Sequence, residues 1–272
     1  MNTIGLNKGK GFKSFINFPT ILDFVKFLAL AGIFIWLLSI GTGQLGYHWQ
    51  WYRIGKFIFT VVDGNFMPGP LLQGLWVTFR ITATSFVLFL IFGITAALLR
   101  GSSLLSARAI ARVYLELIRN TPLLIQLFLI YFAISPILGL SAFTSAVLAL
   151  SLFEGAYASE IIRAGIYSIS KGQLEAAYSL GFSTIDTYRY IIFPQVIRQI
   201  SPPLTGQTIS LIKDSSLVST IAIYDLTMQA QAIVAETFLA FEIWFTVAAI
   251  YLIINITLSF VVRILENRMR LD

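Results

Sequence analysis

The chain has 272 residues, of which 57% are hydrophobic and only 12% are charged, and its mean hydropathy is +0.82. A soluble domain of this size carries about twice that share of charge, so the composition indicates a membrane protein with room for five or six spanning helices of about 20 residues each. Cysteine is absent and His48 is the single histidine, which excludes disulfides and thiolate or histidine metal clusters, and the net charge of +6 does not indicate nucleic acid binding because the basic residues flank apolar runs.

The N-terminal part combines a basic tail with one apolar run. Residues 1–20 are polar and basic, which predicts a cytoplasmic tail. Residues 21–43 predict one extra transmembrane helix, although a basic start, a short apolar core and small residues at the end are also typical of a signal peptide. We expect this segment to be retained. Residues 44–73, rich in Trp, Tyr, Gly and Pro, suit the headgroup layer on the outer side.

Five further apolar runs predict an all-α bundle of transmembrane helices. The amphipathic stretch 111–120 is expected to lie along the inner surface, with Glu116 and Arg119 three residues apart on one face. Asn120-Thr121-Pro122 predicts a cap and a proline that start the next helix. An outer segment is expected at 225–242. The predicted spans are 75–99, 123–137, 141–166, 198–224 and 243–262.

One polar segment, residues 171–194, stands between apolar runs, and we call it the knob. Ser170 with Gln173, and Ser183 with Asp186, fit the pattern in which a hydroxyl and a later side chain satisfy amides at a helix start. The segment therefore predicts two short helices outside the bilayer.

Two residues and the distribution of charge complete this prediction. Gly181 can end the first helix in a left-handed conformation, and Pro194 is expected to stop the second.

With the knob on the cytoplasmic side, the outer segments hold only Arg53 and Lys56 outside the spans, as the positive-inside rule requires. The knob and the C-terminus are therefore expected in the cytoplasm.

The spacing of the knob resembles the EAA loop of ABC importer permeases, with Phe193 where that family usually has leucine. In that family the loop docks into a separate ATPase subunit. The resemblance implies an ATPase-coupling role for Glu175, Ala176, Ala177, Gly181, Ile191 and Pro194.

Three more motifs resemble the polar amino acid branch of these permeases, the histidine and glutamine type: RNTPLLIQLF at 119–128, LSLFEGAYASEIIRAGI at 150–166 and SLIKDSSLVSTI at 210–221. The resemblance covers 71–265 and implies a five-helix permease domain to which 21–43 adds one helix. It also implies a location in a bacterial inner membrane and three partners. These are a second permease subunit that is either identical or a sister protein, an extracytoplasmic substrate-binding protein, and an ATPase subunit. The chain contains no G-x-x-x-x-G-K-S/T phosphate loop, so ATP hydrolysis is expected in that separate subunit, and no cofactor, metal or catalytic residue is expected here.

Ionisable residues within the spans are candidates for the substrate pathway, because a charge near mid-bilayer costs at least about 2.5 to 3.5 kcal/mol. Glu154, flanked by Gly155 and Ala156, either receives the cationic group of an amino acid or bonds to a neighbouring helix. Lys213 and Asp214 have two possible roles. They either act at a gate or cavity, where Asp214 caps a new helical piece, or they make purely structural bonds to another helix.

Two further polar residues are pathway candidates with a structural alternative. Glu160 and Arg163, three residues apart, favour an ion pair, and Gln126 favours a hydrogen bond between helices.

The sequence therefore predicts an ATP-driven importer of polar amino acids. Glu154 favours arginine, lysine, histidine or glutamine over acidic substrates. One alternative is an ion-coupled secondary transporter in which Glu154 or Asp214 couples to protons or sodium. Another is a membrane scaffold for an ATPase that transports nothing.

Overall fold

The structure is a computed structural model that describes residues 25–33, 36, 40–41, 47–62 and 64–271. Its internal contacts divide the chain into two units, Met1–Trp49 and Gln50–Asp272. In the first unit, residues 25–33 are helical and mostly exposed. The predicted tail 1–20 and much of 21–43 lie outside the described residues.

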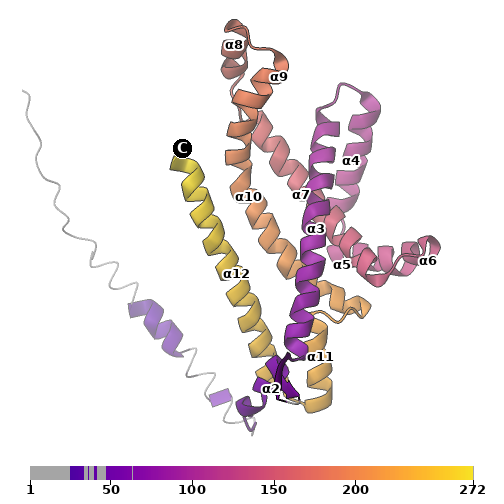
Figure 1. Cartoon of the computed structure of the whole chain (residues 1–272), viewed down its shortest axis with the longest axis vertical. Helices are drawn as coiled ribbons and strands as arrows, with labels where there is room; N and C mark the ends of the chain where they lie inside the picture. The colour runs from indigo at the N-terminus through magenta and orange to yellow at the C-terminus, as the bar shows by residue number, and fades with distance from the viewer. Residues whose placement is uncertain (1–24, 34–35, 37–39, 42–46, 63, 272) are drawn as a thin grey trace, which may run out of the picture. The chain divides into compact units, whose positions relative to one another are not determined.

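The second unit is built almost entirely of helices, which confirms the predicted fold class (Figure 1). Its two β-strands were not predicted. They form an antiparallel hairpin within the stretch assigned from composition to the headgroup layer. In chain order the elements are η1 (Trp51–Arg53), α2 (Gly55–Ile58), β1 (Phe59–Val62), β2 (Asn65–Pro68), α3 (Pro70–Gly101), α4 (Leu105–Arg119), α5 (Leu123–Phe128), η2 (Leu129–Ile134), α6 (Ser135–Leu138), α7 (Ala142–Tyr167), α8 (Lys171–Ser179), α9 (Thr184–Asp186), η3 (Thr187–Ile192), α10 (Phe193–Asp214), η4 (Ser215–Ile221), α11 (Leu226–Thr237) and α12 (Ala240–Leu271).

Three helices of the described residues are each long and apolar enough to cross a membrane: α3, α7 and α12. Two further spans result if each of two bent pairs of consecutive helices is counted as a single span. Leu105–Arg119 is followed by Leu123–Leu138 at 108°, and Thr184–Ile221 is followed by α11 at 49°. Up to five spans result, in line with the five predicted apolar runs.

The segment around α4 departs from the prediction. It does not lie apart along the inner surface but runs beside α3 (Figure 1), with Ala107, Ala111 and Leu115 buried. The hydroxyl of Tyr114 donates to the carbonyl of Leu152 on α7, at 2.6 Å. The small alanine face explains this packing, because it lets α4 approach α3 and α7 closely.

The following segment, α5 to α6, is too short to span alone at 1.5 Å per residue, and it turns sharply from α4. Its start at Leu123 is as predicted, but Asn120 does not cap it. The Asn120 side chain bonds back to the carbonyl and the carboxylate of Glu116, at 2.8 and 2.9 Å. Asn120 therefore ends α4 instead of starting α5.

Pro194 does not stop the second knob helix, as the sequence had predicted. Helical structure continues from Thr184 to Ile221, because the π-helical turn η3 changes the hydrogen-bonding register just before the proline, which sits in the first turn of α10. Proline has no amide hydrogen to donate, and the π-helical turn before it accommodates the missing backbone bond within a continuous helix. The predicted outer segment 225–242 likewise contains a helix, α11, which packs on α3 and α12.

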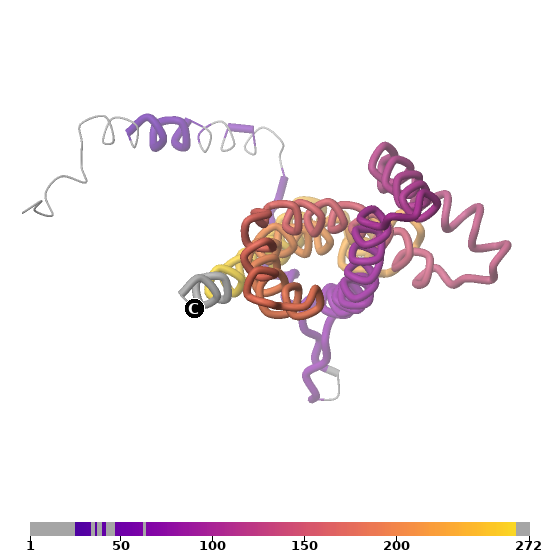
Figure 2. Tube along the Cα trace, turned by 90° about the horizontal axis from the view of Figure 1, so that it is seen from above, coloured from indigo at the N-terminus to yellow at the C-terminus, as the bar shows by residue number. Residues whose placement is uncertain are grey.

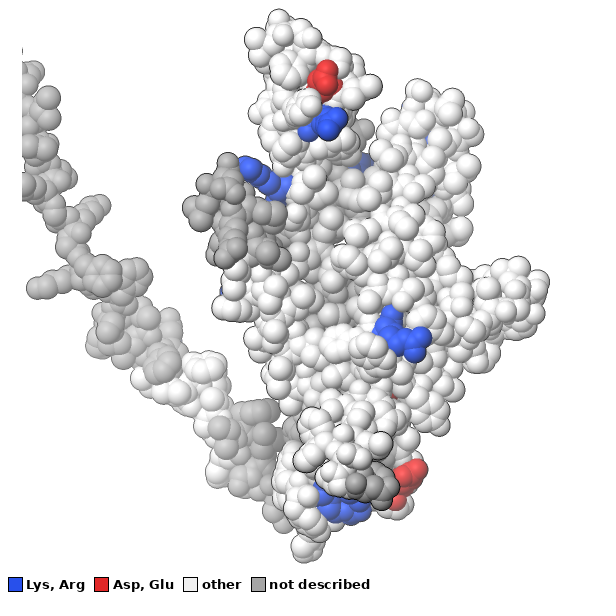
Figure 3. All heavy atoms as spheres, viewed as in Figure 1, with Lys and Arg blue, Asp and Glu red and all other residues white. Residues whose placement is uncertain are grey.

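Two buried apolar clusters hold the helices together. The larger lies among α3, α5, α7, α10 and η4 and includes Phe89, Leu150 and Leu211. The smaller lies at the end of the bundle away from the knob, where Phe57 and Leu71 pack against residues of α11 and α12. The face of the molecule in Figure 3 is largely uncharged between its two ends, apart from one basic patch, as expected of a surface in contact with lipid.

Helices α3 and α7 approach each other most closely at two glycines. A Cβ added at Gly93 would lie 2.8 Å from the Cβ of Ala158, and one at Gly155 would lie 2.8 Å from the Cβ of Phe92. Neither neighbour can swing away, because both are Cβ atoms fixed to helical backbone. Small residues beside Glu154 therefore serve close helix packing, one of the two uses expected from the sequence.

Candidate functional site

The knob forms the tip of the second unit, where α8 and α9 lie beyond the ends of the long helices (Figure 1). Gly181 has φ +82°, which confirms the predicted left-handed turn after the first helix. The Ser183 hydroxyl accepts from the amide of Asp186 at 3.2 Å and bonds its carboxylate at 2.6 Å, so the second predicted cap is confirmed. The first is wrong, because the Ser170 side chain makes no cap bond.

The residues assigned to ATPase coupling lie together on this tip with different exposures. Ala177 is buried against the knob itself, and Ile191 is half-buried. The others, Glu175, Ala176, Gly181 and Pro194, are exposed.

Large apolar side chains on the knob also face outward. Leu180 is 78% exposed and Ile185 is 79% exposed, and Phe182, Tyr190 and Phe193 add further exposed area. Several large exposed apolar side chains on one short segment outside the spans are typical of a surface that binds another protein.

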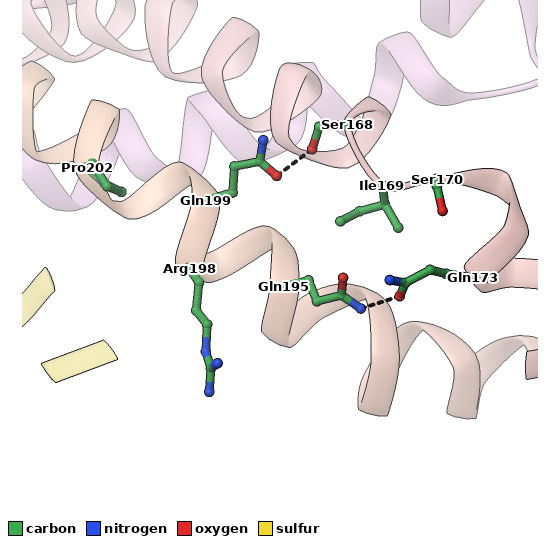
Figure 4. Close-up of a pocket in the computed structure, with 8 residues that line it drawn as sticks. All are labelled: Ser168, Ile169, Ser170, Gln173, Gln195, Arg198, Gln199 and Pro202. Carbon is green, nitrogen blue, oxygen red and sulfur yellow. Dashed lines mark hydrogen bonds between the residues drawn. The ribbon is translucent and has the colours of Figure 1, made fainter. Parts of the chain in front are cut away.

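A cavity of about 640 Å³ separates the knob from α10 (Figure 4), and polar side chains line most of it. Two hydrogen bonds cross between the elements around it. The Gln195 amide donates to the Gln173 side-chain oxygen at 2.6 Å, and the Ser168 hydroxyl donates to the Gln199 oxygen at 2.5 Å. These bonds tie the start of α8 and the end of α7 to successive turns of α10. Gln173, expected to complete a cap, instead joins the knob to α10.

Glu154 is completely buried in the middle of α7. One of its carboxylate oxygens accepts from the side-chain amide of Gln207 on α10. Within the described part of the chain the other oxygen has no hydrogen-bond partner besides the neighbouring carboxyl group of Asp214. The carboxyl group of Asp214 and the ammonium group of Lys213 are its charged neighbours.

The structure thus brings Glu154, Lys213 and Asp214 into one region and adds Gln207, which the sequence analysis missed. Gln207 and Asp214 are seven residues apart, so they share one face of α10, and this spacing is the signal that would have found Gln207. Asp214 does not cap a new helix. The chain passes there from α-helix into the 3-10 helix η4 without a side-chain cap bond.

Glu160 lies in a second polar cluster, nearer the knob. Its carboxylate binds the guanidinium of Arg163 at 2.9 Å, as predicted, and also those of Arg119 at 3.2 Å and Arg100. Arg119 was expected to face Glu116 and reaches Glu160 instead. One carboxylate therefore joins arginines from α3, α4 and α7, which points to a structural role.

Replacing this carboxylate is expected to destabilise the chain. In Glu160→Gln the three guanidinium groups keep a hydrogen-bond acceptor but lose the opposite charge, and since the cluster is partly exposed the loss is about 1 to 2 kcal/mol in the free energy of unfolding. The measurement is thermal unfolding of the purified chain in detergent at low and high salt. The control is Glu116→Gln, which changes an exposed carboxylate that accepts from Asn120. Equal melting temperatures for the two variants would contradict the assignment.

Gln126 is buried at the start of α5 and bonds to the turn before it. Its amide donates to the carbonyl of Ile118 on α4 at 2.7 Å and to the carbonyl of Thr121 at 3.0 Å. The interhelical hydrogen bond favoured by the sequence is present, and Gln126 lies apart from the Glu154 cluster. Among the described residues, no group of three or more His, Asp or Glu side chains could hold a metal ion.

Known proteins with similar sequences share most of this architecture. Residues 89–271 match the family described as binding-protein-dependent transport system inner membrane component. The glutamine transport system permease protein GlnP of Escherichia coli (strain K12) is 41% identical over 204 residues, covering 74% of this chain and 93% of that protein. The L-cystine transport system permease protein TcyB of Bacillus subtilis (strain 168) is 42% identical over 211 residues, covering 77% of this chain and 90% of that protein.

Solved structures agree with these relatives. A chain in the crystal structure of an amino acid ABC transporter with histidines is 39% identical, with a TM-score of 0.68, and the match covers 73% of this chain and 94% of that one. A chain of the inward-facing MetNI methionine ABC transporter is 18% identical with a TM-score of 0.61, and this likeness concerns the fold.

Proposed function

We propose that this chain, which belongs to the family of binding-protein-dependent transport system inner membrane components, imports polar amino acids with amide or basic side chains. Membership makes it the permease subunit of an ABC amino acid importer, an integral membrane protein that is not itself an enzyme. The family also implies an ATPase partner and a substrate-binding protein. ATP-driven transport is therefore favoured over the ion-coupled alternative.

The observation that carries the substrate proposal is the buried carboxylate of Glu154. One oxygen is held by Gln207, and the other has only the carboxyl group of Asp214 beside it among the described residues. An ammonium, guanidinium or amide group supplies the donors that such an acceptor lacks. The printed names of the relatives agree, since one is a glutamine permease and the structural neighbour was solved with histidines. Glutamine, histidine, arginine and lysine are accordingly our candidates.

The knob is our candidate for the surface that docks into the ATPase. Its exposed apolar side chains, among them Leu180 and Ile185, support this assignment, and so does the spacing of Glu175, Gly181 and Pro194. A short helix that lays an apolar face into a groove is a common mode of protein recognition.

We place the knob and the C-terminus in the cytoplasm of a bacterial inner membrane, with the permease domain at 71–265. The excess of Lys and Arg in the segments on the knob side supports this orientation. We also propose a second permease subunit, identical or sister, as a partner. The apolar surface of α12, little of which is buried within the chain, offers it a place to pack, although lipid alone would also cover this surface.

Uptake into proteoliposomes tests the substrate proposal. We expect ATP-dependent uptake of labelled glutamine or arginine when the chain is reconstituted with its ATPase and binding protein. Glu154→Gln is expected to reduce this uptake at least about tenfold, because the loss of a desolvated charge partner costs 2 kcal/mol or more. Labelled glutamate serves as the comparison substrate.

The control variant is Glu116→Gln, which removes an exposed carboxylate far along the chain from the Glu154 cluster. Full uptake by Glu154→Gln would return Glu154 to a structural role and leave the importer assignment intact. Uptake that persists without ATP but collapses with the ion gradient would overturn the ATP-driven mechanism instead.

A further inference from the structure

The β1–β2 hairpin lies outside the residues 89–271 that match the family, and neither the pathway nor the knob uses it. It projects from the end of the bundle opposite the knob (Figure 1). A two-stranded hairpin with an uncovered apolar face is marginally stable in water. The hairpin therefore requires a surface that covers this face.

The base of the hairpin is fixed firmly to the helices. Ile54 and Phe57, on either side of the start of α2, are buried in the smaller apolar cluster. The amide of Gly69 donates to the carbonyl of Ile58 at 2.7 Å, and a Cβ at Gly69 would lie within 2.6 Å of the Phe57 backbone. The hairpin is thus a rigid extension of a packed base.

The register of the strands separates an apolar face from a mixed one. Phe59 pairs with Pro68 and Val61 with Phe66, and because side chains alternate along a strand, these four share one face. Their large side chains are uncovered, with Phe66 78% exposed. The other face carries Thr60 paired with Met67, and Asn65.

The direction of the hairpin matches that of a membrane surface. Viewed along the bundle in Figure 2, the hairpin reaches sideways beyond the helices, roughly perpendicular to their long axis. Its second strand ends at Pro68, and the spanning helix α3 begins at Pro70. The hairpin therefore starts where a span meets the bilayer boundary and extends parallel to that boundary.

The residues that precede the hairpin fit the same boundary. Trp51 and Tyr52 are 49% and 83% exposed, and aromatic rings of this kind concentrate at the headgroup level. Arg53 and Lys56 add positive charge to the same stretch, which suits a headgroup layer rich in lipid phosphates. From its apolar face, its direction and its position at the start of α3, we propose that the hairpin is an interfacial anchor that seats the Phe59, Val61, Phe66 and Pro68 face in the outer lipid leaflet.

A label at a single cysteine tests this proposal, since the native chain contains no cysteine. Phe66→Cys and Asn65→Cys place a nitroxide on opposite faces of the same strand. The full chain is reconstituted in vesicles of phosphatidylethanolamine and phosphatidylglycerol, and collision rates with oxygen and with a water-soluble nickel chelate are measured. We expect the label at 66 to lose most nickel collisions and gain oxygen collisions, and the label at 65 to show the reverse. Unchanged thermal unfolding in detergent establishes that both labelled chains are folded.

The competing occupant of this face is the substrate-binding protein. If the label at 66 collides freely with nickel in vesicles, the lipid anchor is wrong, and protection that appears only on adding the binding protein would identify a protein docking surface. Because these readouts need no transport, a failure of the anchor is distinguishable from a failure of the proposed substrate or importer function.

Discussion

A permease carrying Gly181→Val is expected to remain in the membrane but to lose most of its ATP-driven uptake and its association with the ATPase. Gly181 has φ +82°, and a β-branched residue in the left-handed region is strained by about 1 to 2 kcal/mol or more. A Cβ at this position meets no atom within 4 Å, so the effect arises from the backbone and not from a clash. Relief of the strain would redirect the chain between α8 and Ser183 and displace the exposed apolar patch.

The matched variant at the same position is Gly181→Asn, since asparagine tolerates the left-handed conformation. It is expected to keep ATPase association and uptake near the native level. Co-purification of the ATPase subunit and uptake into proteoliposomes are the two measurements. Native behaviour of Gly181→Val in both would remove the coupling role from this turn.

The second large effect is expected for Gly93→Leu, which should severely destabilise the packed pair of α3 and α7. The Cβ alone would lie 2.8 Å from that of Ala158, so the helices must separate to admit a leucine. Overpacking of this kind costs about 1 to 3 kcal/mol and occasionally more. The melting temperature of the purified chain in detergent, together with its yield in the membrane, measures the loss.

Gly206→Leu provides the control, because a Cβ at Gly206 on α10 meets no atom within 4 Å. Both substitutions replace a helical glycine by a better helix former, which alone would stabilise the chain. A lower melting temperature for Gly93→Leu than for Gly206→Leu therefore isolates the close approach of α3 and α7. Similar stability of the two variants would show that these helices can move apart without cost.

The sequence predicted features that depend on neighbouring residues. Apolar runs located the spanning helices α3, α7 and α12, the Ser183 and Asp186 pair located a cap, and Gly181 located the left-handed turn. Glu160 and Arg163 pair as their spacing on one helix required. Each of these rests on residues within one turn of helix or within one apolar segment, where local geometry decides the outcome.

The features that the sequence analysis missed depend on contacts between residues far apart in the chain, or on places where one rule of local structure overrides another. Gln207 is the partner of Glu154 across 53 positions, and Arg119 crosses from α4 to α7 to meet Glu160. The strands of the hairpin have four residues each, too few for a clear alternation. At Pro194 the local rule that proline ends a helix failed, because the preceding π-helical turn accommodates it while Ile192 and Val196 are buried on either side.

The continuous helix from Thr184 through Pro194 has a mechanical consequence. If the knob docks into the ATPase as proposed, a helix that ended at the proline would have passed the movement of the ATPase through a flexible joint. In the structure the second part of the knob continues into α10 without a break in the helix. Near the knob, Gln195 and Gln199 on α10 bond to Gln173 and Ser168. A rotation at the knob would reach Gln207, which holds Glu154, through the stretch of α10 that contains Pro202 and Pro203, where two backbone hydrogen bonds are missing.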